Sequence, residues 1–291
     1  MAHILVTGAT GKQGGEVAAQ LLERGHEVTA YVRTPESPAA QALASNGARL
    51  ATGDLADAEA LAAAAKGTDG IFGLTVPFGE GGKDEEVAAG KILVDAAAAH
   101  GGHFVYSSVR GADKLVESNM DHADSKQIIE AYLGGREVPA TVLGPVYFME
   151  NALNVGFNRL KEGAFSTPLS PGKPLDQVTV KDIAGMAVHA FENPVEMIGR
   201  RVDIASDRVS GEEVARILGG IFGKDLPYQV FPIAQIRQWA GEEIATMFEA
   251  FEANTDFIDL DSLHAAYPQV RWHSFEDWAR TVDWDRVLAK G

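Results

Sequence analysis

Residues 3–14, HILVTGATGKQG, are the part of the sequence that indicates the fold most directly. Its first part, Ile4 to Thr7, is an apolar run typical of a central strand that is buried on both faces. Glycines follow in a GxxGxxG spacing, and a helix pattern begins at once, from Gln13 to Glu23. This context is typical of dinucleotide-binding proteins, because glycines let the backbone approach a pyrophosphate and the helix N-terminus attracts its charge. We therefore expect a dinucleotide to bind the turn formed by Gly8, Ala9, Thr10, Gly11, Lys12, Gln13 and Gly14.

The alternation of strand and helix continues to residue 143. Further strands are expected at Glu27–Val32, Arg49–Thr52, Gly70–Val76, His103–Ser107 and Ala140–Leu143, and helices at Asp57–Ala65, Asp84–Ala99 and His122–Leu133. This order predicts an α/β fold with a Rossmann-type doubly wound parallel sheet.

The regular alternation of strand and helix patterns ends after Pro145. The patterns there predict a helix near Val180–Phe191, a strand near Arg201–Ala205, a helix capped by Ser210 and a long helix from about Ile233 to Ala253. We expect residues 1–150 to form the NADP-binding Rossmann domain and residues 151–291 a smaller α+β lobe. Segments near 175–210 are candidates to return to the first domain.

Composition excludes several kinds of chemistry. The chain has no cysteine, so disulfides, thiolate nucleophiles and cysteine-held metals are excluded. The histidines show no spacing such as HExxH, and we expect no metal. A net charge of −16 disfavours nucleic acid and anionic lipid. With no apolar run of membrane-spanning length and no signal-peptide pattern, we expect a cytoplasmic protein that binds neither nucleic acid nor membrane.

The end of the second strand indicates which dinucleotide binds. An acid there hydrogen-bonds a free ribose 2′-hydroxyl, whereas an arginine accommodates a 2′-phosphate. The sequence reads Tyr31-Val32-Arg33, so we expect NADP (NADPH) as the cofactor and NAD at lower affinity, unless Arg33 is a solvated loop residue. Other strand ends add Asp54, Leu55, Thr75, Val76, Pro77 and Ser107 to the expected site. Asp54 has an alternative role as the cap of the helix near Asp57.

The chain resembles the NmrA-like family, a group of atypical short-chain dehydrogenases, over essentially its whole length. GATGKQGG at residues 8–15 and the passage Tyr147-Phe148-Met149-Glu150-Asn151 carry the resemblance, with Arg33 and GDLAD at residues 53–57 in support. The resemblance implies NADP(H) in a Rossmann domain, with Tyr147, Phe148, Met149, Glu150 and Asn151 beside the nicotinamide. Many relatives have an arginine just before the proline of this passage, where this chain has Gly144. Some members reduce quinones or dyes, whereas others are catalytically silent redox sensors that bind regulatory partners.

One helix departs from ordinary short-chain dehydrogenases. Those enzymes use Tyr-x-x-x-Lys, in which the lysine binds the ribose and lowers the tyrosine pKa. Here His122-Ala123-Asp124-Ser125-Lys126 keeps the lysine and has histidine in place of tyrosine. Residues four apart share a helix face, so both side chains can reach the cofactor if that face lines the crevice. We expect Lys126 to contact the cofactor, and His122 and Lys126 are the candidate catalytic residues. His122 either donates a proton or merely begins the helix.

Two functions fit these features. The first is an NADPH-dependent oxidoreductase that reduces a small planar apolar acceptor such as a quinone, whose reduced oxygens take protons from water. The second is a non-catalytic NADP(H)-binding redox sensor whose output is contact with a regulatory protein partner. The missing tyrosine is compatible with both, and the first is the preferred interpretation.

Overall fold

The computed structural model describes residues 1–77, 79, 81–114 and 118–290, and the chain divides into two compact units. The first unit comprises Met1–Pro145 and Val180–Ile204, and the second comprises Val146–Thr179 and Ala205–Gly291. The division therefore falls after Pro145 rather than after residue 150, and one later segment returns to the first unit.

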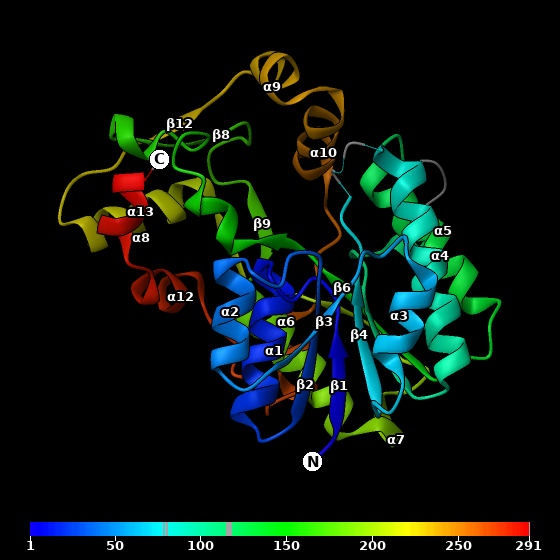
Figure 1. The fold of residues 1–291 in the computed structure, drawn as a ribbon. Coiled ribbons are helices and arrows are strands. Elements are labelled where there is room, and N and C mark those ends of the chain that lie inside the picture. Colours follow the sequence, from blue (N-terminus) through cyan, green and yellow to red (C-terminus); the bar gives the residue numbers. More distant parts are fainter. Residues whose placement is uncertain (78, 80, 115–117, 291) are drawn as a thin grey trace. The chain divides into compact units, whose positions relative to one another are not determined.

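The first unit contains a parallel sheet with the strand order β10-β6-β5-β4-β1-β2-β3 (Figure 1). Its strands are β1 (His3–Val6), β2 (Glu27–Val32), β3 (Arg49–Thr52), β4 (Gly70–Leu74), β5 (His103–Ser107), β6 (Ala140–Pro145) and β10 (Arg201–Ile204). All neighbouring pairs are parallel, and the chain reverses direction across the sheet at β1, which lies between β2 and β4. The predicted Rossmann-type fold is confirmed. In such sheets, ligands bind outside the carboxyl ends of the strands at the point of reversal.

Helices cover both faces of this sheet (Figure 1). On one face α1 (Lys12–Glu23) packs against α6 (Val180–Glu192), and Gln20 Nε2 donates to the Lys181 carbonyl oxygen (2.9 Å). On the other face α3 (Ala58–Ala65), α4 (Gly82–His100) and α5 (Asp121–Gly134) contribute Leu61, Leu93 and Ile129 to one apolar cluster with the sheet. The unit also contains α2 (Pro38–Ser45), α7 (Pro194–Met197) and the short η1 (Ala112–Lys114).

Two predicted elements need correction and the helix α2 is an addition, while the other predicted ends in the first unit agree within two residues. β4 ends at Leu74 rather than Val76, because the Leu74 N–H donates to the Thr7 hydroxyl (3.1 Å) where β1 gives way to the glycine turn. The helix α2 was not predicted, although the Ser37 side chain caps it. The expected long helix is two helices, α9 (Ile233–Ala240) and α10 (Glu242–Ala253), since Gly241 between them has a φ of 91°.

The second unit is a small α+β structure. Its strands are β7 (Tyr147–Phe148), β9 (Pro174–Val178) and β11 (Asp207–Ser210) in one sheet, and β8 (Phe165–Thr167) with β12 (Tyr228–Val230) in another. Its helices are α8 (Gly211–Phe222), α9, α10, α11 (Leu260–Ala266), α12 (Phe275–Thr281) and α13 (Trp284–Lys290), with η2 (Met149–Leu153) and η3 (Leu160–Glu162). Ser210 forms the predicted capping box with Glu213 at the start of α8, and Trp278 and Trp284 are buried in the core of this unit. None of the helices in the described part of the chain is long and apolar enough to span a membrane.

Candidate functional site

The glycine turn after β1 brings backbone groups close together. Gly8 has a φ of 62°, which favours glycine, and its carbonyl accepts a hydrogen bond from the Gly11 N–H (2.9 Å). A Cβ atom at Gly14 would lie 2.4 Å from the Gly8 carbonyl oxygen, so this glycine lets α1 start against the end of β1. Gly11 is exposed and has a φ of −89° and a ψ of 175°, a conformation open to any residue. Its lack of a side chain is therefore not required by the backbone conformation.

The N-terminus of α1 has the features of an anion site. The helices α2, α3, α8, α11 and α12 each begin at a Ser or Asp whose side chain accepts a hydrogen bond from the first turn. By contrast, α1 begins at Gly11, no described side chain caps it, and its first turn contains no acid. The helices α4, α5, α7, α9 and α10 also lack a described side-chain cap, but all of these except α9 have an acid in the first turn. The first N–H groups of α1 and the positive end of its dipole are therefore available to a phosphate. Thr10 and Lys12 are exposed beside Gly11, so the geometry fits the pyrophosphate of a dinucleotide.

Gln13 connects this turn to the end of β5. Its Nε2 atom donates a hydrogen bond to Ser107 Oγ (2.5 Å), and Ser107 is buried. Ala9 is buried as well, so it packs the turn against the unit rather than facing solvent. The structure thus brings the expected residues Gln13 and Ser107 into direct contact.

A tyrosine that the sequence analysis did not assign to the site holds the ends of β2 and β3 together. Tyr31 Oη donates to the Asp54 carbonyl oxygen (2.9 Å), and a Cβ atom at Gly53 would lie 2.1 Å from that hydroxyl. Burial, followed by the charges of Asp57 and Asp54, raises the pKa of Tyr31, which keeps the phenol neutral. Asp54 accepts from the Ala56 N–H (2.9 Å), whereas Asp57 caps α3. The alternative in which Asp54 caps that helix is therefore wrong.

Arg33 is exposed directly after β2, and among the described residues it has no ion-pair partner. Leu55 is half-buried beside the exposed Asp54. These positions at adjacent strand ends suit contacts with the adenosine half of a dinucleotide.

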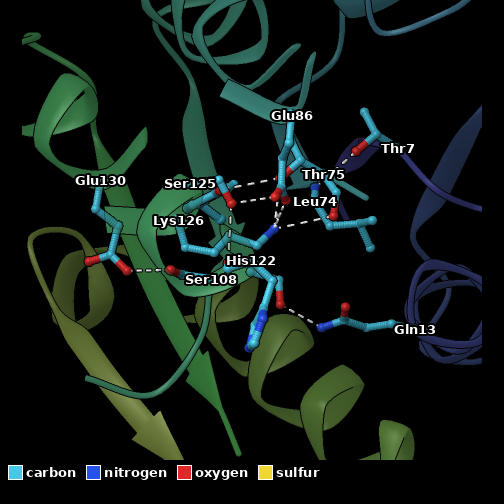
Figure 2. Close-up of polar contacts among 12 residues, drawn as sticks. Thr7, Gln13, Leu74, Thr75, Glu86, Ser108, His122, Ser125, Lys126 and Glu130 are labelled. Carbon is cyan, nitrogen blue, oxygen red and sulfur yellow. Dashed lines mark hydrogen bonds and ion pairs between the residues drawn. The ribbon is translucent and has the colours of Figure 1, made fainter. Parts of the chain in front are cut away.

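A buried ion pair lies where β4 ends (Figure 2). Lys126 Nζ on α5 is 2.8 Å from Glu86 Oε1 on α4, and the two side chains are 7% and 0% exposed. The ammonium also donates to the Thr75 hydroxyl (2.7 Å) and the Thr75 carbonyl oxygen (3.2 Å). Burial lowers the pKa of Lys126, and the Glu86 carboxylate opposes that shift. Two expected site residues, Thr75 and Lys126, are thus in direct contact, and both also bind a carboxylate that was not predicted.

Glu86 binds further hydroxyls. Thr75 Oγ1 donates to Glu86 Oε1 (2.7 Å), and Ser125 Oγ donates to Glu86 Oε2. We call Thr75, Glu86, Ser125 and Lys126 the Glu86–Lys126 cluster. Glu86 lies at helical spacing from Gly90, Leu93, Val94 and Ala97, which form the buried face of α4. A lone acid within such an apolar stripe is the sequence signal that could have identified it.

Tyr106 of β5 packs against the cluster. Its hydroxyl is 3.5 Å from Thr75 Oγ1, and Lys126 Nζ lies 5.7 Å from the centroid of its ring. Burial raises the pKa of Tyr106 strongly, which makes this phenol a weaker acid than a solvated tyrosine. Tyr106 is therefore no substitute for the tyrosine of the Tyr-x-x-x-Lys motif.

His122 and Lys126 take different directions from α5. The helix begins at Asp121, one residue before His122, and His122 is half-buried. Figure 2 shows the His122 imidazole pointing away from the Lys126 ammonium, although the two residues are four positions apart. The lysine turns into the Glu86–Lys126 cluster, so the two side chains do not converge.

Side chains of β10 fill the space at Gly144, where many relatives carry an arginine. A Cβ atom at Gly144 would lie 2.2 Å from Asp203 Oδ1 and 3.2 Å from guanidinium nitrogens of Arg201. Arg201 forms an ion pair with Glu130 of α5 (2.9 Å) and another with Asp203. Glu130 in turn accepts a hydrogen bond from Ser108 Oγ, in the residue after β5 (Figure 2). The side chains of Asp203 and Arg201 thus occupy the space beside Gly144.

The passage from Tyr147 to Asn151 begins the second unit. Tyr147 packs edge-on against Phe248 and Phe251, with ring centroids 6.2 Å and 5.9 Å away, and burial raises its pKa to about 12. A cavity of about 30 Å³ is lined by Tyr147, Phe248 and their neighbours within this unit. This volume suits about one water molecule and is too small for a quinone ring.

The rest of that passage is partly committed to the core of the second unit. Met149 is fully buried, and Glu150 accepts a hydrogen bond from Thr179 Oγ1 (2.7 Å). Phe148 and Asn151 are half-buried. The position of this passage beside a nicotinamide ring stays a prediction.

Comparison with known proteins adds independent findings. The model of the NmrA-like family matches residues 1–279. An NAD(P)H azoreductase of Xenophilus azovorans is 30% identical over 240 residues, which cover 81% of this chain and 79% of the relative. An NmrA-like family domain-containing oxidoreductase of Cladobotryum sp is 31% identical over 253 residues, which cover 78% and 75% of the two chains.

Solved structures share the fold over the whole length. NmrA, a negative transcriptional regulator in complex with NADP, has a TM-score of 0.78 at 20% identity, with 100% of this chain and 98% of that chain covered. An NADPH-dependent quinone oxidoreductase from Escherichia coli, complexed with NADPH, has a TM-score of 0.77 at 22% identity, with 95% and 98% covered. At these identities the likeness shows the fold alone.

Proposed function

Because this chain belongs to the NmrA-like family, we propose that it is an NADPH-dependent oxidoreductase that reduces a small planar apolar acceptor such as a quinone. The observation that carries the proposal is the open N-terminus of α1, where N–H groups that no described side chain caps and the exposed Gly11 fit a pyrophosphate. Arg33 would bind the 2′-phosphate of NADP(H), and Asp54 and Leu55 would lie along the adenosine. The segment Thr75–Pro77 would border the ribose nearer the nicotinamide.

The acceptor class follows from the poor supply of protons near Lys126. NADPH supplies a hydride when bound, so the acceptor needs only protons in addition. Tyr106 is a weak acid because burial raises its pKa, and His122 points away from the cluster (Figure 2). A quinone suits such a site, since its reduced oxygens take protons from water. The azoreductase relative and the quinone oxidoreductase neighbour are named for planar conjugated acceptors, which supports this class.

An assay of NADPH oxidation across quinones and azo dyes tests the proposal. We expect turnover with at least one quinone and none with the Gly11→Val variant, whose side chain blocks the approach to α1. An oxidation rate no higher than without enzyme, for every acceptor, would contradict the reductase function.

A non-catalytic NADP(H) sensor is the second candidate. The closed Glu86–Lys126 cluster favours it, because the ammonium is engaged by protein groups rather than directed at a substrate. The two candidates separate in one preparation: the sensor binds NADPH in a calorimetric titration yet oxidises it with no acceptor.

A further inference from the structure

The ammonium of Lys126 is saturated by protein acceptors. A lysine has three N–H donors, and three oxygens lie within hydrogen-bond distance of Nζ. They are Glu86 Oε1 at 2.8 Å, Thr75 Oγ1 at 2.7 Å and the Thr75 carbonyl oxygen at 3.2 Å. A lysine that binds a ribose must give at least one donor to a ribose hydroxyl. Lys126 gives all three to Glu86 and Thr75.

The partners of Lys126 are equally committed. The Thr75 hydroxyl accepts from Lys126 and donates to Glu86 Oε1 (2.7 Å), while Ser125 donates to Glu86 Oε2. Both charges are nearly inaccessible to water. Opening such a pair is unfavourable, because a separated buried charge lacks both its partner and solvent.

The cluster fixes the chain where it leaves β4. Lys126 binds Thr75 through both its carbonyl and its hydroxyl. One residue earlier, the Leu74 N–H is held by the hydroxyl of Thr7, which immediately precedes the glycine turn (3.1 Å). One residue later, Val76 is 62% exposed. The cluster thus anchors a short segment, residues 75–77, that starts beside the turn and is exposed at Val76.

We propose that Lys126 and Glu86 are positioning residues: their buried charge pair holds Thr75, and through it the segment 75–77, in the place where this segment borders the cofactor, and Lys126 itself does not bind the cofactor. This inference rests on the proposed cofactor site. It replaces the expected contact between Lys126 and the ribose, and it assigns Glu86 a role in the site.

A double-mutant cycle tests the proposal. The variants are Lys126→Met, Glu86→Gln and the combination of the two, with the dissociation constant for NADPH measured by calorimetry and Tm by thermal unfolding. Gln keeps the shape of Glu86 and one of its two acceptor oxygens, and Met fills the volume of the lysine stem. Each single variant strands one buried charge, whereas the combination strands none.

We expect each single variant to bind NADPH at least about tenfold more weakly and to have a lower Tm, since a stranded charge disturbs Thr75. The combination should recover to within about threefold of wild-type affinity, although it lacks the ammonium. If the combination binds as weakly as Lys126→Met while Glu86→Gln binds normally, the lysine contacts the cofactor and the proposal is overturned. Lower Tm with unchanged affinity in both single variants would also overturn it, because the pair would then serve stability alone.

Two further arms complete the design. The control variant combines Arg136→Met with Asp95→Asn. It removes an exposed ion pair (3.2 Å) between Arg136, which follows α5, and Asp95 on α4, and it should leave NADPH affinity unchanged. If the Lys126→Met/Glu86→Gln protein does not fold, the single variant Glu86→Gln decides. A lysine that binds the cofactor directly would let this variant bind NADPH as tightly as the wild type does, whereas a positioning pair would not. If the wild-type protein binds no NADPH, the proposed function is contradicted. If the wild type binds NADPH but the Lys126→Met/Glu86→Gln variant binds it weakly, only the positioning role is contradicted.

Discussion

The glycine turn follows β1, and the Glu86–Lys126 cluster lies where the neighbouring strand β4 ends. The two sites differ in whether their hydrogen-bond donors have partners within the protein. The turn leaves the first N–H groups of α1 without a described side-chain cap, next to an exposed glycine. The cluster directs every ammonium donor of Lys126 to a protein oxygen. Capacity for a ligand lies where donors are left over, and rigidity lies where they are used up. Charge and burial alone therefore do not identify the group that binds.

Two glycines of the turn, Gly14 and Gly11, look equivalent in sequence but have different surroundings. We expect Gly14→Val to yield no folded protein, because even a Cβ atom at Gly14 would lie 2.4 Å from the Gly8 carbonyl oxygen. Circular dichroism and thermal unfolding of the purified variant measure this. A Gly14→Val protein with a cooperative transition near that of the wild type would contradict the close packing of α1 on β1.

Gly11→Val is the matched change at the exposed glycine. The nearest described atom to a Cβ atom there is the Gly8 carbonyl oxygen at 3.2 Å, and the local φ and ψ suit valine, so the protein should fold. NADPH affinity should fall by more than about 100-fold, because the side chain occupies the space through which phosphate reaches the helix N-terminus. Calorimetric titration decides, and unimpaired binding would place the cofactor elsewhere.

This contrast also explains what could be predicted from the sequence. The turn is contiguous, so its strand, glycines and helix were identified from spacing alone, as were most elements of the sheet. The cluster joins Thr75, Glu86 and Lys126 from three elements, and nothing local to Glu86 tells which residues α4 packs against. The edge position of β10 beside β6 is likewise set by tertiary pairing. Long-range packing was the information that periodicity lacked.

His103 is a buried polar residue at the opposite end of β5 from the site, and we expect it to affect stability rather than cofactor binding. It opens β5, whereas Ser107 ends that strand, and its Nε2 atom lies 2.8 Å from Thr141 Oγ1. Burial lowers the pKa of His103 to about 4 from 6.5, so the folded protein binds fewer protons than the unfolded chain between these values. Stability present at neutral pH is therefore lost as the pH falls from 6.5 toward 4, by about 3 kcal/mol.

Urea unfolding of wild type and His103→Gln across this pH range isolates that contribution. The variant should lose less stability on acidification, and its NADPH affinity at neutral pH should equal that of the wild type. An unchanged pH slope would show that His103 titrates equally in both states.

The exposed Arg33 side chain is expected to bind a ligand for the same reason as the first N–H groups of α1, because its donors have no ion-pair partner among the described residues. We expect Arg33→Ala to weaken NADPH binding by about 10- to 100-fold and to leave NADH binding nearly unchanged, because a charge-assisted contact with the 2′-phosphate contributes about 1.5 to 3 kcal/mol. Parallel titrations with both cofactors measure the preference. A wild-type preference that survives in the variant would make Arg33 an ordinary solvated loop residue.

His122 gives the smallest and most selective effect, because it shares α5 with the cluster but points away from Lys126 (Figure 2). If its role is to donate a proton, His122→Phe should leave NADPH affinity intact, since the cofactor contacts proposed above do not involve the imidazole. Enones, whose reduction requires a proton from a positioned acid, should then be reduced about fivefold more slowly. Quinones should change by less than about twofold, because their reduced oxygens take protons from water. Paired kinetics on the two acceptor types, with cofactor affinity measured alongside, separate proton donation from binding. Equal losses on both acceptors would indicate a disturbed site rather than a missing acid, and wild-type rates on both would leave His122 as a residue that merely starts the helix.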